Sequence, residues 1–375
     1  MSETIVNNRL IAELMKDSSI TVAKGIGIIL MVLGHSIGEY GDYLTPVRSF
    51  IYMFHMPLFF ALSCYCFKEK YLTDFKTFTW HKVKGLYFPF VKYGLLFLLL
   101  HNVFYHLNIY NGQYGWRTYV SHLHTWQETL DKVYFNIILF TRSEQLLGGY
   151  WFIVQLFWAS IIAWIVIRII RNPLIGSCIV LIMSVLYDKF IPTIPYSAIG
   201  GLSFFSAFFF LTGYAIKKFD VKIVKYQGLL CVLVVWVSSV FWKTEMQSCN
   251  KYTLLPYCIT AILGTLMTMQ LSRTIATLTK GYFKLFFIFV GEHTLEILTW
   301  HLLCFKVVTF LAIWVEDKPI EMLSQFPILN DQNYPVWWLF YLIVGVGLPL
   351  LGVWIRKKAM VMCTKVNTLY FSRIS

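Results

Sequence analysis

Ten apolar stretches, most of them long enough to cross a bilayer as a helix, dominate this sequence and limit what it can fold into. A transmembrane helix needs about 20 mostly apolar residues. The candidate spans lie near residues 22–41, 47–67, 84–107, 149–170, 173–188, 200–217, 227–242, 252–271, 285–314 and 335–355. The fifth and seventh are short, whereas the ninth is long and carries charge, which indicates a tilted or broken helix. The pattern predicts an all-α, polytopic membrane helix bundle of about ten transmembrane helices.

Composition supports a membrane protein and argues against a nucleic-acid partner. The chain has 375 residues, of which 58% are hydrophobic and 14% charged, whereas soluble domains have roughly 45–50% and about 25%. A soluble fold of this size has no means of hiding so much apolar surface. The formal net charge of +13 would suggest nucleic acid in a soluble protein. Here the basic residues lie in short loops between apolar runs, which is typical of membrane topology.

Lysine and arginine are concentrated in alternate loops, and this sets the predicted orientation. If the N-terminus is cytoplasmic, the inner loops carry most of the basic residues, near 68–84, 168–171, 217–225, 273–284 and 356–365. We therefore expect both termini to be cytoplasmic. Residues 1–19 show no signal-peptide pattern and are predicted to form a cytoplasmic tail. Residues 20–375 are then one membrane domain, with an outer loop near 108–147 that is either functional or a cap on the bundle.

The eight cysteines give no sign of a metal or disulfide framework. Most lie inside apolar runs and none forms a C-x-x-C pair, whereas zinc sites need clustered ligands. We expect small buried hydrophobes and no bound metal. Cys249 and Cys258, near one predicted outer loop, are the one candidate disulfide pair.

Polar residues inside the first two spans are the first candidates for a functional site. His35 follows Lys24 by eleven residues, a spacing that puts both on one helix face about 16 Å apart along the axis. Lys24 is then at the cytoplasmic end and His35 near the midplane. His55 enters the second span from the outer side to a similar depth. A polar residue at that depth is costly and indicates function; a structural histidine bonded to a neighbouring helix is the alternative.

Two further regions have polar groups whose roles spacing alone does not decide. Lys82 and Lys84 precede the third span and are either topology signals or a phosphate clamp. Trp151 opens the fourth span, where an aromatic belt predicts it.

The ninth span contains five ionisable residues within about four turns, which is the strongest sign of a polar site in the bundle. They are Glu292, His293, Glu296, His301 and Lys306. Because five such groups cannot all face lipid, they either line an aqueous cavity or pair with residues such as His35 and His55.

Taken together, four blocks resemble the membrane acyltransferase-3 family, and most closely its fucose 4-O-acetylase-like branch. They are Lys24 to His35, FHMPLFF from Phe54 to Phe60 with the following ALSCY, Lys82-x-Lys84 with Pro89, and GEHTLEILTWH from Gly291 to His301. The pair Trp151-Phe152 also resembles the family. Two features depart from the family. Cys64 stands where the family usually has glycine. Lysines replace arginines of the first and third blocks, and lysine keeps the positive charge but lacks the planar guanidinium that binds a phosphate through two parallel hydrogen bonds.

The resemblance implies an enzyme that moves an acyl group, by preference acetyl, from cytoplasmic acyl-coenzyme A to a hydroxyl of an extracytoplasmic sugar or polysaccharide. Acetyl-coenzyme A is then a co-substrate and no cofactor stays bound. We expect a multi-pass protein of the bacterial cytoplasmic (inner) membrane. Lys24, Lys82 and Lys84 would hold the donor phosphates, and His35 would act as general base.

The remaining roles are assigned to the same spans. Glu292 or Glu296 would orient His35 or His55. Arg48, His55, Trp151 and His301 would support the site or contact the acceptor.

A membrane transporter or exporter of glycan precursors is the alternative function, because carriers also bury histidines and glutamates near the midplane. Carriers often show internal repeats, and we find none in the sequence. A scaffold protein without catalytic activity is a third class, but it would give no reason for Lys24 to align with His35.

Overall fold

The computed structural model is helical throughout the residues that it describes, which are 2–38, 43–115, 120–191, 197–277, 281–330 and 332–371. Side chains are described within residues 18–359. The first half of the chain forms α1 (Ser2–Ser36), α2 (Thr45–Tyr52), α3 (His55–Tyr65), α4 (Phe75–Lys82), α5 (Phe88–Leu99), α6 (His101–His106), α7 (Trp126–Lys132) and α8 (Trp151–Ile170). The second half forms α9 (Pro173–Phe190), α10 (Gly201–Lys218), α11 (Lys225–Phe241), α12 (Leu254–Thr277), α13 (Tyr282–Glu292), α14 (Thr294–Val315) and α15 (Trp337–Phe371).

Each of the ten apolar stretches coincides with one helix or with two helices that follow each other in the chain. The second consists of α2 and α3, separated at Met53 and Phe54, and the ninth consists of α13 and α14, separated at His293. The expected break in the ninth stretch is thus confirmed. One boundary differs, because α1 begins at Ser2 and runs without a break through the predicted tail.

Six of the described helical segments are long and apolar enough to cross a membrane. They are Ser18–Ser36, Thr45–Tyr65, Gln145–Ile170, Leu254–Thr277, Thr294–Val315 and Trp337–Ala359. Pro173–Tyr187 and Lys225–Phe241 are apolar but shorter. Helix α10 contacts α3, α8 and α9. Because these helices cover most of its surface, α10 needs fewer apolar side chains to cross a bilayer. The chain is therefore a multi-pass helical membrane protein, while the number ten and the side of the termini stay predictions.

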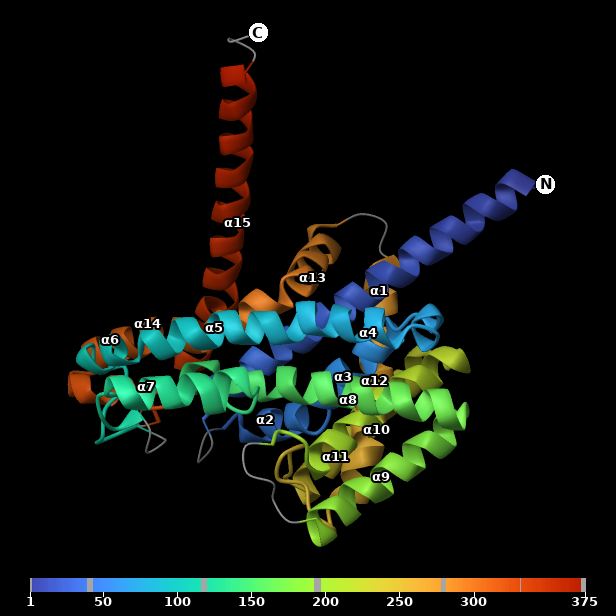
Figure 1. The fold of residues 1–375 in the computed structure, drawn as a ribbon, viewed down its shortest axis with the longest axis horizontal. Coiled ribbons are helices and arrows are strands. Elements are labelled where there is room, and N and C mark those ends of the chain that lie inside the picture. The colour runs from blue at the N-terminus through green and yellow to red at the C-terminus, as the bar shows by residue number, and fades with distance from the viewer. Residues whose placement is uncertain are drawn as a thin grey trace.

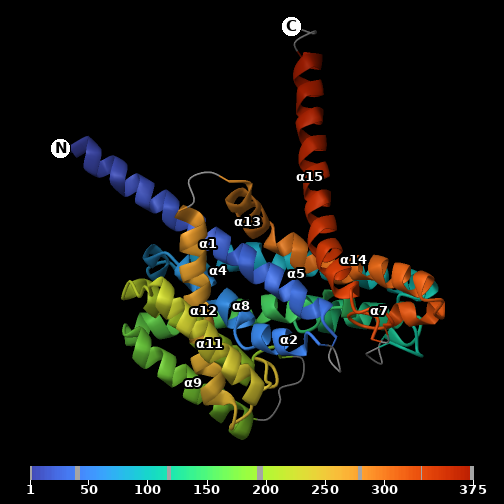
Figure 2. The ribbon, with the colours of Figure 1, turned by 180° about the vertical axis from the view of Figure 1, so that it is seen from behind.

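Helix α1 lies at the centre of the bundle, in contact with α3, α12, α13, α14 and α15 (Figures 1 and 2). Two glycines bring it against α13. A Cβ at Gly291 would lie 1.9 Å from the Thr21 carbonyl oxygen, and one at Gly25 would lie 2.4 Å from the Phe287 oxygen. The two backbones therefore touch, as small residues permit between membrane helices. This contact fixes the register of α1 against the α13–α14 segment.

Helix α3 packs antiparallel on the other side of α1. A Cβ at Gly27 would meet Leu58 and Phe59, and one at Gly34 would meet Tyr52 and Ile51. The end of α3 that carries Ser63 therefore points toward the Lys24 end of α1.

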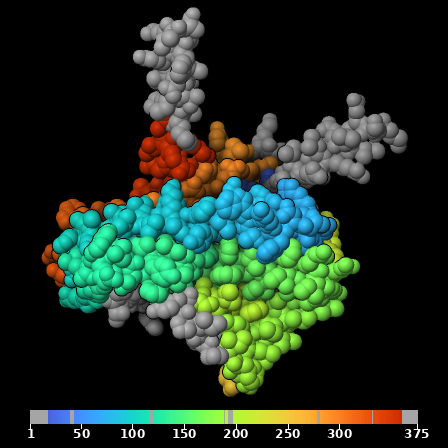
Figure 3. Space-filling view, in the orientation of Figure 1, coloured from blue at the N-terminus to red at the C-terminus, as the bar shows by residue number. Residues whose placement is uncertain are grey.

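The predicted outer loop is a folded cap rather than an irregular loop. It contains α7, a wide π-type turn at Val133–Ile138 and a 3₁₀ turn at Gln145–Tyr150. Asn111 binds the segment after α14, donating to the Glu321 carbonyl at 2.7 Å and accepting from Ser324 at 2.8 Å. Figures 1 and 3 show α6, α7 and the far end of α14 gathered at one end of the molecule. This segment therefore packs against the end of the bundle, while its position outside the membrane and any functional role stay predictions.

Cys249 and Cys258, the candidate disulfide pair, are both free thiols.

Candidate functional site

Three histidines and a tyrosine from α1, α2, α3 and α14 meet where these helices cross. Tyr52 Oη lies 3.4 Å from His35 Nδ1, and the Tyr52 and His55 rings lie 4.9 Å apart between centroids. The His301 ring lies 5.6 Å from that of His35. Arg48 covers Tyr52, with its guanidinium carbon 4.4 Å from the ring centre. Of the site residues predicted from the sequence, the structure therefore brings together His35, His55, His301 and Arg48.

The meeting of His35 and His301 follows from the glycine contact. Gly25 and Gly291 oppose each other, and each is followed ten residues later by one of the two histidines. Helix α14 begins at Thr294, directly after the break at His293, and it brings the His301 ring to 5.6 Å from that of His35. The block from Lys24 to His35 and the block from Gly291 to His301, which are far apart in the sequence, therefore contribute residues to one site.

Backbone contacts decide which ring nitrogen two of these histidines can offer. His301 Nδ1 donates to the Ile297 carbonyl at 3.0 Å, and His55 Nδ1 donates to the Ile51 carbonyl at 3.0 Å. Because a carbonyl oxygen only accepts, the neutral rings keep a lone pair on Nε2. His301 is fully buried, and its Nε2 has no hydrogen-bond partner within the described structure. A buried acceptor of this kind is poised to receive a proton or a hydroxyl hydrogen.

Tyr52 was missed by sequence reasoning. It lies in the apolar run RSFIYMF, and nothing in the spacing distinguishes it from a packing aromatic residue. Its hydroxyl lies 3.4 Å from His35 Nδ1. Its position one turn before His55 was the available signal.

The two glutamates are not where they were expected, and this is a correction. Glu292 is exposed at the end of α13, and Glu296 pairs with Arg356 of α15 at 3.1 Å. No hydrogen bond joins either of them to His35 or His55 in the described part of the chain. Glu296 therefore faces α15, while His301, further along α14, faces α1.

The other ionisable residues of the ninth stretch also have separate partners. His293 Nδ1 donates to the Phe289 carbonyl at 2.7 Å, and its Nε2 accepts from Lys357 at 2.9 Å. Lys306 is buried and donates to the Leu323 carbonyl at 2.9 Å and to that of Gln325. The five ionisable residues therefore lie in separate environments and do not line one aqueous cavity.

The three lysines assigned to the donor are placed differently from one another. Lys24 is half-buried on α1 and makes no hydrogen bond or ion pair with a described residue. Lys82 lines a cavity of about 300 Å³ between α3 and α4. Lys84 is exposed and lies over the Trp80 ring at 5.1 Å, outside the lining of that cavity. Lys82 and Lys84 therefore do not form one clamp, which was one of the two interpretations that their spacing left open.

Trp151 lies deeper than an aromatic belt would place it. Helical structure begins at Gln145, and neighbouring Tyr150 bonds Thr299 of α14 at 2.7 Å, two residues before His301. Phe152 packs on Phe60 with 4.9 Å between ring centroids. Trp151 is therefore half-buried inside the span, close to the level of the histidines.

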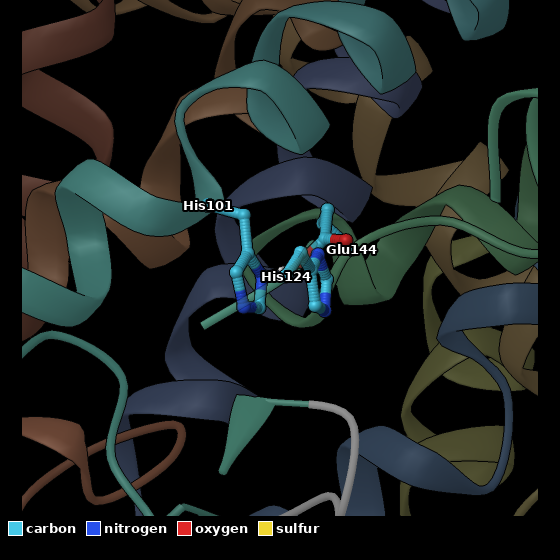
Figure 4. A group of neighbouring side chains, drawn as sticks. All are labelled: His101, His124 and Glu144. Carbon is cyan, nitrogen blue, oxygen red and sulfur yellow. Dashed lines mark hydrogen bonds and ion pairs between the residues drawn. The ribbon is translucent and has the colours of Figure 1, made fainter. Parts of the chain in front are cut away.

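The cap holds a second group of ionisable side chains, His101, His124 and Glu144 (Figure 4). All three are buried. The two imidazole rings are stacked, with centroids 3.3 Å apart and an interplanar angle of 11°. His101 Nδ1 lies 3.3 Å from Glu144 Oε2, and its Nε2 lies 3.1 Å from the His122 carbonyl. The His122 carbonyl accepts from Nε2–H, and Nδ1 shares one hydrogen with the Glu144 carboxyl group.

This geometry does not suit a metal ion. An imidazole binds a metal in the plane of its ring, and the parallel rings in Figure 4 have no shared in-plane position. Lys132 Nζ also lies 2.5 Å from His124 Nε2, which brings a cation to one presumed ligand. The group is better described as a buried hydrogen-bonded pair, Glu144 with His101, whose imidazole ring stacks on His124.

Glu128, an exposed carboxylate of the cap, stabilises the start of α7. Thr125 and Glu128 form a reciprocal capping box at the start of α7. Hydrogen bonds from the Thr125 backbone, and then from His122, hold the pKa of Glu128 at about 2. Glu128 is therefore ionised at neutral pH, and the box loses its charge only as pH falls through about 2.

Comparisons with known proteins show the family to which the chain belongs. The chain is 31% identical, over 163 residues, to the nodulation protein NolL of Mesorhizobium japonicum (strain LMG 29417 / CECT 9101 / MAFF 303099). The aligned part is 42% of this chain and 36% of that protein, so the match covers about a third of the relative's length. No solved structure matches. A family model described as an acyltransferase domain matches residues 17–354, nearly the whole described chain and all of its site residues. The chain therefore belongs to this acyltransferase family.

Proposed function

We propose that the protein is a transmembrane O-acyltransferase that moves an acetyl group from cytoplasmic acetyl-coenzyme A to a hydroxyl of a cell-surface sugar or polysaccharide. In this proposal ten helices cross the bacterial inner membrane and both termini are cytoplasmic. The observation that carries it is the pair formed by His35 and His301, which offers buried basic nitrogens where helices of the bundle cross. Membership of the acyltransferase family supplies the reaction class.

His35 acts as the general base in this proposal. Its Nδ1–H donates to Tyr52 Oη, which leaves Nε2 to take the proton of the sugar hydroxyl. The hydroxyl oxygen attacks the thioester carbonyl carbon and forms a tetrahedral intermediate. The C–S bond then breaks, and the coenzyme A thiolate leaves and takes the proton from His35. General-base help of this kind is worth about 10²–10⁴-fold in rate.

His301 accepts a hydrogen bond through Nε2 from a neighbouring hydroxyl of the same sugar and so positions the acceptor between the two rings. Its proton-bearing Nδ1 is already bound to backbone, so the ring cannot turn without losing that bond. His55 and Arg48 hold Tyr52 from two sides. Arg48 thereby supports the histidine pair from the predicted outer end, where the acceptor enters.

The donor extends from the opposite end. Lys24 lies eleven residues before His35 on α1, a distance of about 16 Å that suits an extended pantetheine arm. Lys24 and Lys82 neutralise the donor phosphates, and Lys82 lies beside the cavity at the Ser63 end of α3.

The test uses the full chain in proteoliposomes with radiolabelled acetyl-coenzyme A. The acceptor is the surface glycan fraction from cells that lack the gene. Wild type should transfer label, and His35→Ala should reduce the rate at least about 100-fold. His106→Ala, which changes a histidine of the cap, is the matched control and should retain the wild-type rate. Full transfer by His35→Ala would refute its role, and export of glycan without acetylation would identify a carrier instead.

A further inference from the structure

A cavity in the cap has no part in the proposed reaction. Its volume is about 180 Å³, which is below the usual range for drug-sized ligands and suits a single sugar ring. It lies between the α5–α6 segment and the start of α7, at the end of the molecule where Figure 1 shows α6 and α7 together. The residues that line it are Leu98, Leu99, Asn102, His124, Trp126 and Thr129.

Trp126 gives this cavity an accessible aromatic ring. The residue is 72% exposed, and Thr129, three residues later, lies on the same face of α7. An aromatic belt accounts for a tryptophan near a membrane surface, but it does not account for the cavity beside the ring. The negative face of an indole attracts the slightly positive C–H groups that form the apolar face of a pyranose. The cavity therefore has the stacking surface that a sugar needs.

Asn102 and Thr129 supply hydrogen-bonding groups that are already held in place. Asn102 donates to the His124 carbonyl at 3.0 Å and accepts from the His124 backbone N–H at 2.8 Å. The Thr129 hydroxyl donates to the Thr125 carbonyl at 3.0 Å. A primary amide has a second N–H, and a hydroxyl that donates also accepts. Both side chains can therefore bind a sugar hydroxyl and keep these bonds.

The charge of the lining indicates a neutral ligand. Within the described chain, no lysine, arginine, aspartate or glutamate lines the cavity. Lys132 contacts His124 Nε2 but is not part of the lining. A phosphorylated lipid headgroup binds best beside a cation, whereas a sugar needs only hydrogen bonds and an apolar face.

The cavity and the histidine pair lie on different sides of α14. Phe97 of α5 packs on Trp300 of α14, with 5.4 Å between the ring centroids, and the next residue, His301, faces His35. Leu98, which follows Phe97, lines the cavity. A ligand in the cavity therefore does not touch the reacting atoms, and a glycan of several units is needed to reach both places.

We infer that the cap cavity is a carbohydrate-binding subsite that holds a sugar unit remote from the reacting hydroxyl, with the pyranose face on Trp126 and sugar hydroxyls on Asn102 and Thr129. The inference rests on the proposed function for identifying the bound glycan as the acceptor. It narrows the acceptor to an oligosaccharide or polysaccharide and excludes a free monosaccharide as the preferred substrate.

Equilibrium binding to the full chain in phosphatidylcholine nanodiscs tests the subsite without a donor. The probes are end-labelled oligosaccharides of several units, released from the surface glycan of cells that lack the gene. Trp126→Ala removes the stacking ring and should weaken binding about tenfold. Thr129→Val keeps the shape, removes the hydroxyl and should weaken binding about fivefold. In the transfer assay, Trp126→Ala should raise the KM for these oligosaccharides about tenfold and leave kcat and the donor KM unchanged.

Matched controls separate the cavity from general damage. Trp314→Ala removes an indole of α14 that is 76% exposed and does not line the cavity. Thr277→Val removes an exposed hydroxyl of α12 that donates to the Thr274 carbonyl at 2.7 Å. Both should bind the oligosaccharides as wild type does. Wild-type binding by Trp126→Ala and Thr129→Val would overturn the inference, as would an equal loss in Trp314→Ala.

The nanodisc composition tests a lipid headgroup as the occupant instead. Oligosaccharide affinity should be the same in phosphatidylcholine alone and with phosphatidylglycerol added. Displacement of the oligosaccharide from wild type by phosphatidylglycerol would assign the cavity to lipid and overturn the inference. A chain that binds oligosaccharide through Trp126 but transfers no acyl group would refute the proposed function and leave the subsite standing. Acyl transfer by Trp126→Ala with the wild-type acceptor KM would overturn the subsite and leave the proposed function standing.

Discussion

At the scale of residues, hydrogen bonds decide which nitrogen each buried histidine can offer. His55 and His301 both donate a hydrogen bond from Nδ1–H to a backbone carbonyl of the preceding turn. His35 Nδ1 instead forms its hydrogen bond with the side-chain hydroxyl of Tyr52. A hydroxyl can donate or accept, so His35 alone can change its tautomer without breaking a backbone bond. That difference fits a group that gains and loses a proton in each cycle.

Tyr52→Phe tests this difference with little change in packing. The ring stays between Arg48 and His55, and the hydroxyl beside His35 is lost. We expect kcat to fall about tenfold, the value of one hydrogen bond, with the donor KM unchanged. The control is Tyr226→Phe, because Tyr226 is exposed on α11. A Tyr52→Phe enzyme with wild-type kcat would remove Tyr52 from the mechanism.

At the scale of elements, the contact between α1 and α13 sets the distance between the two histidines. Gly291→Ala would place a methyl group on the Thr21 backbone oxygen, which is rigid. We expect the helices to separate, with a loss of about 1–3 kcal/mol in stability and a larger loss of activity. Thermal unfolding in detergent and the transfer assay measure the two effects.

Gly347→Ala is the matched change, since a Cβ there meets open space. It should leave both quantities as in wild type. If Gly291→Ala does the same, the close approach of α1 and α13 does not exist in the protein.

The cap makes a separate prediction about stability. Glu144→Leu would leave His101 Nδ1 buried without its carboxyl partner, which costs about 1–3 kcal/mol for an unsatisfied buried group. Asp220→Asn breaks the exposed pair with Lys222 and should change stability by about 0–1 kcal/mol. Unfolding midpoints of the two variants compare them directly. Equal midpoints would mean that the contact between His101 and Glu144 adds nothing to stability.

At the scale of the whole molecule, the sequence predicts the helices well and their contacts less well. The length of an apolar run depends on the bilayer, so all ten stretches became helices. His35 and His301 are 266 residues apart, and their meeting depends on glycine contacts that periodicity does not register. The assignment of Glu296 failed because Glu296 faces α15 and pairs with Arg356.

Topology is the other prediction at this scale. In a background with the exposed Cys66 and Cys178 replaced by serine, Gln127→Cys in the cap should react with a membrane-impermeant maleimide on spheroplasts. Lys225→Cys, on a predicted inner loop, should react only after permeabilisation. The reverse pattern would place the cap in the cytoplasm and the donor end outside.

The central claim is that the buried histidine pair acylates a surface sugar, and one measurement in cells tests it most directly. Cells that lack the gene are complemented with wild type, His35→Ala or His106→Ala, at matched protein levels, and their surface glycans are analysed by mass spectrometry. The acetylated glycan should appear with wild type and with His106→Ala and be absent with His35→Ala. Equal acetylation with His35→Ala, or none in wild type, would contradict the account.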